Sequence, residues 1–254
     1  MNAEAFLAAL DLPASCQVDQ RVPKKLLLEN GAPTAADKLQ ITEGIEECWW
    51  LATLKPTTIG VPAYRDTLRE YLEIVVLRLT LRAGAKAARL VDLVHRAVPY
   101  PVLLLTEQQA RITLSVAHKR WAHNEVGKTV VDGDTLQVEW QAKRDGVHWP
   151  AFRTGLALER QPAATLHALY QGWLDTLLAL EAARITGALQ PTADRHQAAA
   201  RRQALDEYQR LDGMIAQLRA AATKEKQIAR QVELNLEVKR LETAQAAARA
   251  KLSL

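Results

Sequence analysis

The last quarter of the chain contains the feature that most restricts its fold. Residues 194–254 contain no proline and only one glycine, Gly213. Two mainly apolar series repeat there at alternating spacings of four and three: Leu211, Ile215, Leu218 and Ala222, and then Leu234, Val238, Leu241, Gln245, Ala248 and Leu252. Such spacing buries one stripe of a helix, and a change of register near residues 223–227 predicts a helical hairpin or a stutter in a coiled coil. The stripe is rich in alanine, so we expect it to pack against itself, the rest of the chain, a second copy or a partner.

The residues before this tail show a mixed pattern of strands and helices. We expect helices at 2–10, at 20–30 with Asp19 as its cap, and at 34–52, 86–97 and 166–185. We expect strands at 72–82, 102–105 and 111–118, and a hairpin at 129–140 that turns at Asp132-Gly133-Asp134. The sequence therefore predicts an α+β body, residues 1–160, whose mixed β-sheet is flanked by helices. A helical region, residues 161–254, follows it and includes the coiled-coil-like tail, residues 194–254.

Charge and cysteine content restrict the class of protein. The net charge of +4 comes from 33 basic and 29 acidic residues, a mild excess that permits contact with nucleic acid or an acidic partner. Cys16 and Cys48 lie far apart and have no metal-ligand spacing, so we expect reduced thiols in a cytoplasmic protein without a metal or cofactor. The longest apolar run is far shorter than the roughly 20 residues of a membrane helix.

The sequence contains no complete catalytic motif. A glycine-rich phosphate loop is absent, and none of the three serines lies in a nucleophile elbow. A divergent metal-dependent nuclease is an alternative hypothesis, because Glu73, Asp132 and Glu139 could hold magnesium in such an enzyme. The Glu-x-Lys pair that nucleases of this type carry on a strand is missing, since Lys143 follows Glu139 at the wrong spacing. We therefore favour a protein without catalytic residues.

Two short basic clusters are candidate contacts with nucleic acid. One lies at the predicted start of a helix, where extra cations are disfavoured by the helix dipole and so require a reason. The other combines cations with an aromatic ring at the end of a predicted strand, a combination that suits a nucleic-acid backbone and its bases. The candidate residues are Arg21, Lys24, Lys25, Lys119, Arg120 and Trp121.

Three stretches together resemble a known family. They are Arg21-Val-Pro-Lys-Lys25, Val98-Pro-Tyr-Pro-Val-Leu-Leu-Leu105 and Lys224-Glu-Lys-Gln-Ile-Ala-Arg-Gln-Val-Glu-Leu-Asn235. With His118-Lys119-Arg120 and Glu139-Trp140 between them, the chain resembles the bacterial domain-of-unknown-function family numbered 4391. The sequence departs from the tail pattern of that family at Ile228, Ala229 and Gln231. Several polar side chains of this tail motif share a helix face, which suits a specific helix–helix interface: Lys224, Lys226, Gln227, Arg230, Glu233 and Asn235.

The resemblance implies a setting rather than an activity. Members of the family are encoded beside Swi/Snf-type helicases and adenine DNA methyltransferases, in restriction or antiviral defence gene clusters. Our first hypothesis is therefore a non-catalytic accessory subunit of a DNA-processing complex, whose tail binds a helicase or DNA methyltransferase and whose body contacts DNA. The nuclease is the second hypothesis. A homodimer that associates through the tail, without nucleic acid, is the third.

Overall fold

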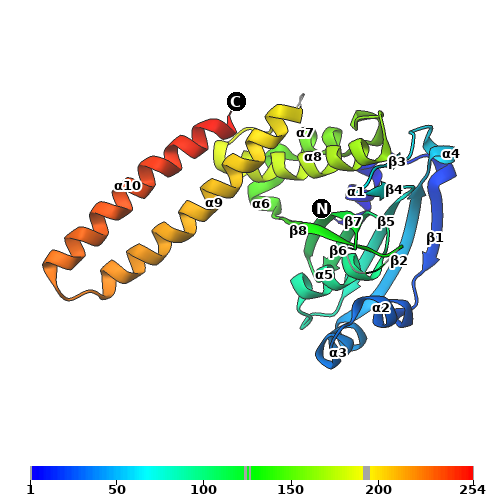
Figure 1. Ribbon diagram of the computed structural model, residues 1–254, viewed down its shortest axis with the longest axis horizontal. Helices are drawn as coiled ribbons and strands as arrows, with labels where there is room; N and C mark the ends of the chain where they lie inside the picture. Colours follow the sequence, from blue (N-terminus) through cyan, green and yellow to red (C-terminus); the bar gives the residue numbers. More distant parts are fainter. Residues whose placement is uncertain (1, 123–124, 126, 191–194, 254) are drawn as a thin grey trace. The chain divides into compact units, whose positions relative to one another are not determined.

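A computed structural model describes residues 2–122, 125, 127–190 and 195–253 (Figure 1). Its contacts divide the chain into two compact units, Met1–Leu177 and Leu178–Leu254. The first unit contains a mixed sheet with helices, and in the second two long helices pack against each other. The predicted α+β class is thereby confirmed, and of the two predicted forms of the C-terminal region, a helical hairpin or a coiled coil, the structure shows the hairpin.

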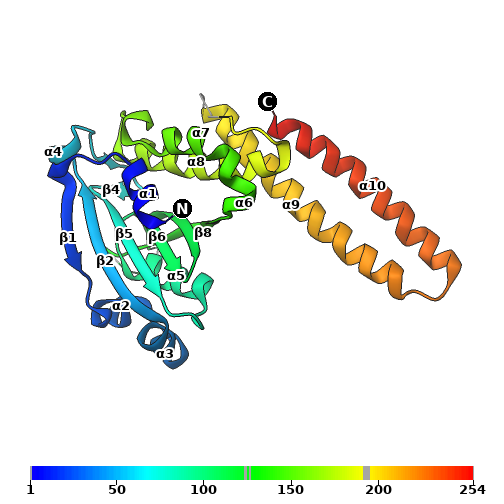
Figure 2. The same ribbon diagram turned by 180° about the vertical axis from the view of Figure 1, so that it is seen from behind.

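The main sheet of the first unit has six strands in the order β1-β2-β5-β6-β7-β8 (Figure 2). The strands are β1 Gln17–Arg21, β2 Ile45–Leu54, β5 Ile74–Leu81, β6 Val102–Gln108, β7 Arg111–Trp121 and β8 Thr129–Trp140. Neighbouring strands are antiparallel except β5 and β6, which are parallel and are connected by a helix, α5. A small second sheet pairs β3, Tyr64–Arg65, with β4, Glu70–Tyr71.

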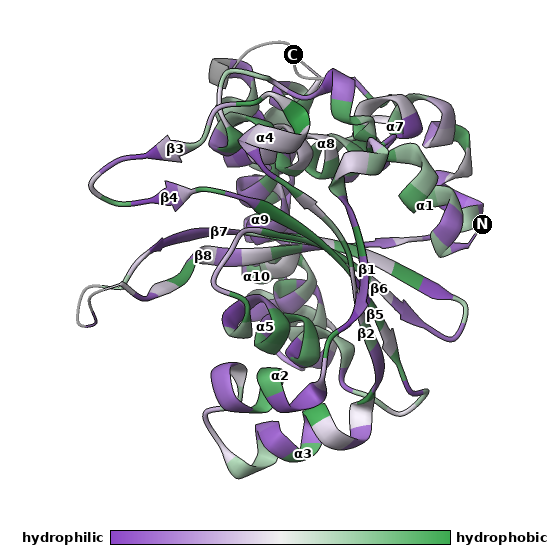
Figure 3. Ribbon diagram, turned by 90° about the vertical axis from the view of Figure 1, so that its right-hand side faces the viewer, coloured by the Kyte–Doolittle hydropathy of each residue, from purple (hydrophilic) through white to green (hydrophobic). Residues whose placement is uncertain are grey.

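Helices lie on both faces of the main sheet (Figure 3). The helices of the chain are α1 Ala3–Ala9, α2 Lys24–Gly31, α3 Ala35–Gly44, α4 Pro56–Ile59, α5 Ala87–Ala97, α6 Ala142–Asp145, α7 Trp149–Leu156, α8 Leu166–Thr186, α9 Arg195–Lys224 and α10 Ile228–Leu252. Short 3-10 turns occupy Ala14–Cys16, Gly146–His148 and Leu158–Arg160. Helix α3 begins as the sequence suggests, because the Thr34 side chain accepts a hydrogen bond from the Asp37 amide at 3.1 Å.

The central strands β5 and β6 are almost continuously apolar because both of their faces are covered. On one face, Leu77 and Leu104 pack with Leu90 and Val94 of α5. On the other face, Tyr170 of α8 donates a hydrogen bond from its hydroxyl group to the Val102 carbonyl at 2.7 Å. An aromatic cluster continues this second layer through Phe6, Trp140, Trp149 and Phe152.

The prediction of one helix over residues 34–52 is wrong in its second half. Helix α3 ends at Gly44, where a Cβ atom would lie 2.7 Å from Leu90 of α5, and the chain continues as strand β2. The helical spacing of Ile45 and Cys48 misled the prediction. Both residues face the same core because a β-bulge between Ile45 and Glu47 adds one residue to the strand.

The predicted hairpin within residues 129–140 is also wrong. These residues form one strand, β8, and its hairpin partner is the preceding strand, β7. The register shifts between Val116 and His118 of β7, whose partners Leu136 and Asp132 are four residues apart. Gly133 has a φ of 78° at this irregularity. The Asp-Gly pair therefore marks a bulge in a long edge strand rather than a turn.

In the second unit, α9 and α10 lie side by side as an antiparallel hairpin (Figure 1). Its seam contains the predicted positions, of which Leu211, Ile215 and Val238 are buried. Between the helices, Arg219 pairs with Glu242 at 2.5 Å and Gln245 donates to Asp212 at 2.9 Å. The predicted change of register at residues 223–227 coincides with the connection between the two helices.

Candidate interaction surfaces

The structure places the six candidate nucleic-acid residues at two separate locations in the first unit. Arg21 lies on the edge strand β1, and Lys24 and Lys25 begin the helix that follows it. Lys119, Arg120 and Trp121 end β7, which lies beyond β2, β5 and β6 in the sheet. Four spacings between neighbouring strands separate β1 from β7, which amounts to about 19 Å. The six residues therefore do not form one continuous patch.

Lys24 contacts the C-terminal end of a neighbouring helix, α3, and this contact explains why a cation lies at this position. Its ammonium group donates to the Thr42 carbonyl at 3.0 Å, and Arg82 donates to the Glu43 carbonyl at 2.9 Å. Both carbonyls belong to the last turn of α3, where cations are favoured by the helix dipole. Burial lowers the pKa of Lys24, and the nearby Arg82 and Arg21 lower it further. Lys24 therefore has a structural role as a cap of α3.

The other two cations at this location form exposed ion pairs. Arg21 lies 3.4 Å from Glu47, and Lys25 lies 3.7 Å from Glu29 on the same helix. Their side chains remain largely accessible, and exposed pairs of this kind contribute only about 0–1 kcal/mol. Arg21 and Lys25 therefore remain able to contact an anionic partner.

The prediction that Lys119 contacts nucleic acid is wrong, because its side chain is buried. The residue is 1% exposed, and its ammonium group donates to the carbonyl oxygens of His95 and, at 2.7 Å, of Val98. Both acceptors belong to the last turn and cap of α5. Burial lowers the pKa of Lys119 to about 7. A side chain held inside the first unit cannot reach a phosphate group.

Arg120 and Trp121 are half-buried at the end of β7. Arg120 lies 3.6 Å from Asp132 on β8, and Arg69 binds the same carboxylate at 2.6 Å. The Trp121 amide donates to the Leu68 carbonyl at 2.8 Å, which attaches the loop between β3 and β4 to this end of β7. Asp132 balances part of the positive charge, so this location is a mixed rather than a strongly basic surface.

The carboxylates of the nuclease hypothesis lie apart and serve other contacts. Glu73 pairs with Lys55 at 3.0 Å, and Asp132 pairs with two arginines. Glu139 lies seven residues beyond Asp132 on β8, opposite Thr113, which corresponds to roughly 20 Å along the strand. Within the described ranges, no group of three or more His, Cys, Asp or Glu residues could hold a metal ion.

A polar chain that the sequence did not reveal connects β4, β7 and α8. The Lys119 amide donates to the Tyr71 hydroxyl oxygen at 3.3 Å, and Tyr71 lies 2.5 Å from Nδ1 of His118. Burial raises the pKa of Tyr71, so its hydroxyl keeps its proton. His118 Nε2 then donates to Gln171 at 2.8 Å, and Gln171 donates to Asp175 at 2.8 Å.

Both ring nitrogens of His118 therefore lie within hydrogen-bond distance of a partner, Tyr71 for Nδ1 and Gln171 for Nε2. His167 stacks on His118 with ring centroids 5.2 Å apart, which adds an aromatic contact from α8. The chain therefore joins the small β3–β4 sheet and α8 to the main sheet. Its members come from distant segments, so no local motif in the sequence could have indicated it.

The six residues of the tail motif lie at the connection of the hairpin. Lys224 ends α9, Lys226 and Gln227 lie in the connection, and the others lie on the first two turns of α10. We define the tip surface as these exposed residues: Lys224, Lys226, Gln227, Arg230, Glu233 and Asn235. Arg230 and Glu233 pair at 2.6 Å. Within the described part of the chain, the side chains of the other four form no hydrogen bond or ion pair.

Three large apolar side chains of α10 are exposed beside the tip surface. Ile228 is 77% exposed, Val232 52% and Leu236 62%. They follow one another at intervals of four residues and therefore form one stripe along the helix, which we call the outer stripe. Exposed single apolar residues are common, but a continuous stripe indicates an interaction surface.

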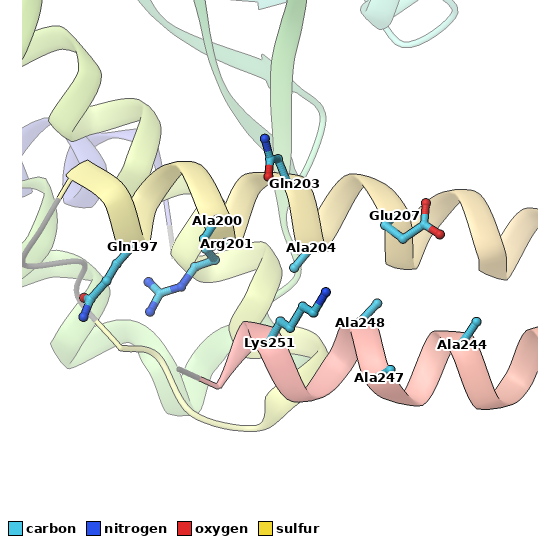
Figure 4. A pocket seen from close by; sticks show the side chains of 10 residues that line it. All are labelled: Gln197, Ala200, Arg201, Gln203, Ala204, Glu207, Ala244, Ala247, Ala248 and Lys251. Atoms are coloured by element: carbon cyan, nitrogen blue, oxygen red, sulfur yellow. The ribbon is translucent and has the colours of Figure 1, made fainter.

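At the other end of the hairpin, small side chains leave a groove of about 620 Å³ between α9 and α10 (Figure 4). Ala200 and Ala204 contribute from α9, and Ala244 and Ala248 from α10. Arg201 also lines the groove but donates to the Gln190 carbonyl at 2.7 Å. The groove follows from the alanine-rich seam that the sequence shows, because alanines facing each other cannot fill the space between two helices.

The fold and these surfaces define an α+β protein that carries a helical hairpin with an exposed tip. A family model described as "Domain of unknown function (DUF4391)" matches residues 10–244, so the chain belongs to this family. The match includes the whole tip surface, and it confirms the resemblance seen in the sequence. No curated protein and no solved structure matches the chain. Among the described helices, none is long and apolar enough to cross a membrane.

Proposed function

We propose that this protein is a non-catalytic accessory subunit of a bacterial DNA-processing complex in the cytoplasm. The hairpin formed by α9 and α10 binds a helicase or DNA methyltransferase subunit through the tip surface. A restriction-modification or antiviral defence complex is the setting that the family resemblance implies. In this role the first unit is a stable support that holds the hairpin and contributes secondary contacts.

The tip surface is the observation that carries this proposal. Lys224, Lys226 and Asn235 are exposed and form no side-chain bond within the described part of the chain. Polar residues that stabilise a hairpin would bridge its two helices, as Arg219 and Glu242 do at 2.5 Å. The tip residues make no such bridge, so stability of the hairpin does not account for them. Specific recognition of a partner accounts for these exposed polar residues.

Contact with DNA is the secondary part of the proposal. The accessible residues for it are Arg21 and Lys25 at one location and Arg120 with Trp121 at the other. Each location offers one or two cations, and all three cations have an acidic partner. We therefore expect DNA binding to depend on the assembled complex and to weaken steeply with salt.

The experiment is co-purification of the tagged full chain with the proteins encoded beside it. The Lys224→Glu/Arg230→Glu variant reverses two charges of the tip surface and leaves the hairpin seam intact. We expect the wild type to retain the helicase or methyltransferase and the variant to retain at least about tenfold less, which corresponds to 1.4 kcal/mol.

The matched control reverses two charges at the opposite end of the same hairpin, Arg202→Glu/Arg249→Glu, where both side chains are exposed. It should retain the partner as the wild type does. Equal loss of the partner in both variants would indicate a nonspecific charge effect. Retention of the partner by the tip variant would contradict the proposed binding site. Circular dichroism of both variants confirms that the helices remain folded.

A further inference from the structure

Strand β8 is an edge of the main sheet, and part of its backbone faces no neighbouring strand. The Ala122 amide donates to the Lys128 carbonyl at 2.8 Å, and the two strands stay in register from there to residue 132. In an antiparallel pair such bonds join alternate residues, so Thr129 and Val131 direct their N–H and C=O groups away from β7. Within the described ranges, no hydrogen bond satisfies these four groups. They form an open row that is able to pair with a further strand.

A groove of about 400 Å³ lies along this open row, and we call it the edge groove. Strand β8 forms one wall between Lys128 and Thr135. Asp92 and Arg96 of α5, which contacts β8 on one face of the sheet, form the other wall, and Asn30 of α2 adds to it (Figure 3). An extended segment can join a sheet at such an edge, because main-chain bonds supply affinity and side-chain contacts supply specificity.

The strand and the helix run in opposite directions along the edge groove. The Thr129 hydroxyl group donates to the Pro99 carbonyl at 2.6 Å, just beyond the C-terminal end of α5. At the other end, the Gln137 amide group approaches the Asp92 carboxylate at 3.4 Å. Arg96 therefore lies nearer the end of the groove at Thr129, and Asp92 lies nearer the opposite end.

The charges of the edge groove differ between these two ends. Arg96 is exposed and has no hydrogen bond or ion pair within the described part of the chain. Lys128, at the same end, pairs with Glu125 at 2.8 Å, so Arg96 is the cation that a ligand can use. Asp134 is exposed, likewise has no partner among the described residues, and lies with Asp92 towards the other end. The edge groove therefore has a basic end and an acidic end.

We propose that the edge groove binds an extended segment of a partner protein, which pairs with β8 as an additional antiparallel strand and carries a Lys-x-Glu pattern. Asp92 and Arg96 are four residues apart on α5, which corresponds to about 6 Å along the helix. Two residues of a strand span about the same length, and their side chains share a face. A lysine and a glutamate two positions apart therefore match Asp92 and Arg96. This surface belongs to the first unit and is independent of the tip surface.

The direction of the segment and its backbone pairing follow from the same geometry. An antiparallel segment runs from the acidic end of the groove to the basic end, so its lysine precedes its glutamate. Thr129 points towards the end of α5, and residues directly opposite each other in a sheet share a face. The glutamate therefore lies opposite Thr129 and the lysine opposite Val131. The backbone amides of these two segment residues face β8, and those of the residues next to them face away.

The experiment uses the peptide Ser-Thr-Lys-Val-Glu-Thr-Ser with a fluorescein label, and fluorescence anisotropy measures its binding to the full chain. We expect a dissociation constant on the order of 100 µM. Methylation of the lysine and glutamate backbone amides should weaken binding at least about tenfold, because both donors to β8 are lost. Methylation of the valine amide and of the amide that follows glutamate is the matched control and should change the affinity less than about twofold. Equal affinities of the two methylated peptides, or no binding of the unmodified peptide up to about 1 mM, would overturn the inference.

A charge reversal in the protein tests the pattern of the segment. Arg96→Glu should bind the Lys-x-Glu peptide at least about tenfold more weakly than the wild type does. The same variant should bind a peptide with lysine in place of the glutamate more tightly than the wild type does, which a merely structural role of Arg96 would not produce. If Arg96→Glu shows no such exchange of preference while circular dichroism shows intact helices, the Lys-x-Glu pattern is wrong.

Sedimentation of the chain alone distinguishes a partner protein from a second copy. The wild type and Arg96→Glu should sediment alike at about 50 µM. A dimer of the wild type that Arg96→Glu dissolves would place β8 of a second copy in the edge groove and overturn the inference. The Lys224→Glu/Arg230→Glu variant should bind the peptide as the wild type does, because it changes only the tip surface. Failure of the peptide to bind would therefore leave the proposed role of the tip surface to its own co-purification test.

Discussion

The two units bury their apolar residues in different ways. In the first unit, Leu77 and Leu104 of the central strands are 1% and 0% exposed and contact large side chains of α5. In the second unit, the seam between α9 and α10 includes alanines such as Ala204 and Ala248, which leave a groove of about 620 Å³. The first unit therefore has a filled core, whereas the hairpin is held by a thinner contact that has unfilled space beside it.

This difference in packing means that apolar burial stabilises the first unit more than it stabilises the hairpin. Filled cores gain roughly 1.5–3 kcal/mol for each large side chain removed from water, and alanine pairs gain much less. The hairpin also exposes Ile228, Val232 and Leu236, whereas the corresponding residue types in the central strands are covered. The central strands of the first unit therefore cover their large apolar side chains more completely than α10 does.

The largest expected effect is a cavity in the core of the first unit. Leu104→Ala should lower the free energy of unfolding by about 4 kcal/mol, because the rigid sheet cannot collapse around the missing atoms. Leu211→Ala, in the hairpin seam, should cost only about 2 kcal/mol. All six tryptophans lie between residues 49 and 173, so tryptophan fluorescence during urea unfolding reports on the first unit, and hydrogen exchange of the α9 and α10 amides reports on the second. Equal effects of both substitutions would show that the two regions are equally well packed.

The next effect concerns the buried cation of the first unit. The pKa of Lys119 is about 7 in the folded protein and 10.5 in the unfolded chain, so between these values the unfolded state binds more protons. Stability should therefore rise between pH 7 and pH 9, by a few kcal/mol at most. Above pH 9 the buried thiol of Cys48, whose pKa is about 12, opposes this trend.

Urea midpoints at pH 7, 8 and 9 measure this slope, and Lys119→Met should remove most of it. His95 adds a slope of the same sign at lower pH, because its pKa is lowered to about 3 by burial and by Lys119. As the pH falls from 6.5 towards 3, the unfolded chain takes up a proton that the folded protein excludes, and stability is lost. An unchanged slope in Lys119→Met would contradict this assignment.

Local sequence patterns predicted the elements that depend on local periodicity. The apolar runs of β5 and β6 and the seam of the hairpin were found because each repeats at its own period over many residues. Strand β2 was missed because a bulge gave Ile45 and Cys48 the spacing of a helix. The register of a strand depends on its neighbours in the sheet, and these lie far away in the sequence.

The same contrast between local and tertiary information applies to the residues that the sequence assigned to interaction surfaces. The tip residues were identified from a contiguous motif, and the structure places all six at one end of the hairpin. Lys119 was assigned to the surface because it follows an alternating strand, yet α5 covers the face of β7 that carries Ser115 and Lys119. Which face of a strand meets solvent is a tertiary property, and a lysine in the sequence does not reveal it.

Filling the groove of the hairpin should reduce the difference in packing between the two units. Ala204→Leu places a large side chain into the space beside Ala248, and we expect a gain of about 1 kcal/mol from the apolar area removed from water. Hydrogen exchange of the α9 and α10 amides measures the gain locally. Ala216→Leu, at an exposed position of α9, is the control and should change little. A loss of protection in Ala204→Leu would show that the helices cannot accommodate the added side chain.

The smallest expected effect is the ion pair that crosses the hairpin. Arg219 and Glu242 lie 2.5 Å apart, but their side chains are 63% and 41% exposed, so water screens their attraction. A double-mutant cycle with Arg219→Ala and Glu242→Ala should give a coupling energy below about 1 kcal/mol, and it should decrease further in high salt. A coupling as large as the cost of Leu211→Ala would mean that charge, rather than the apolar seam, holds α9 and α10 together.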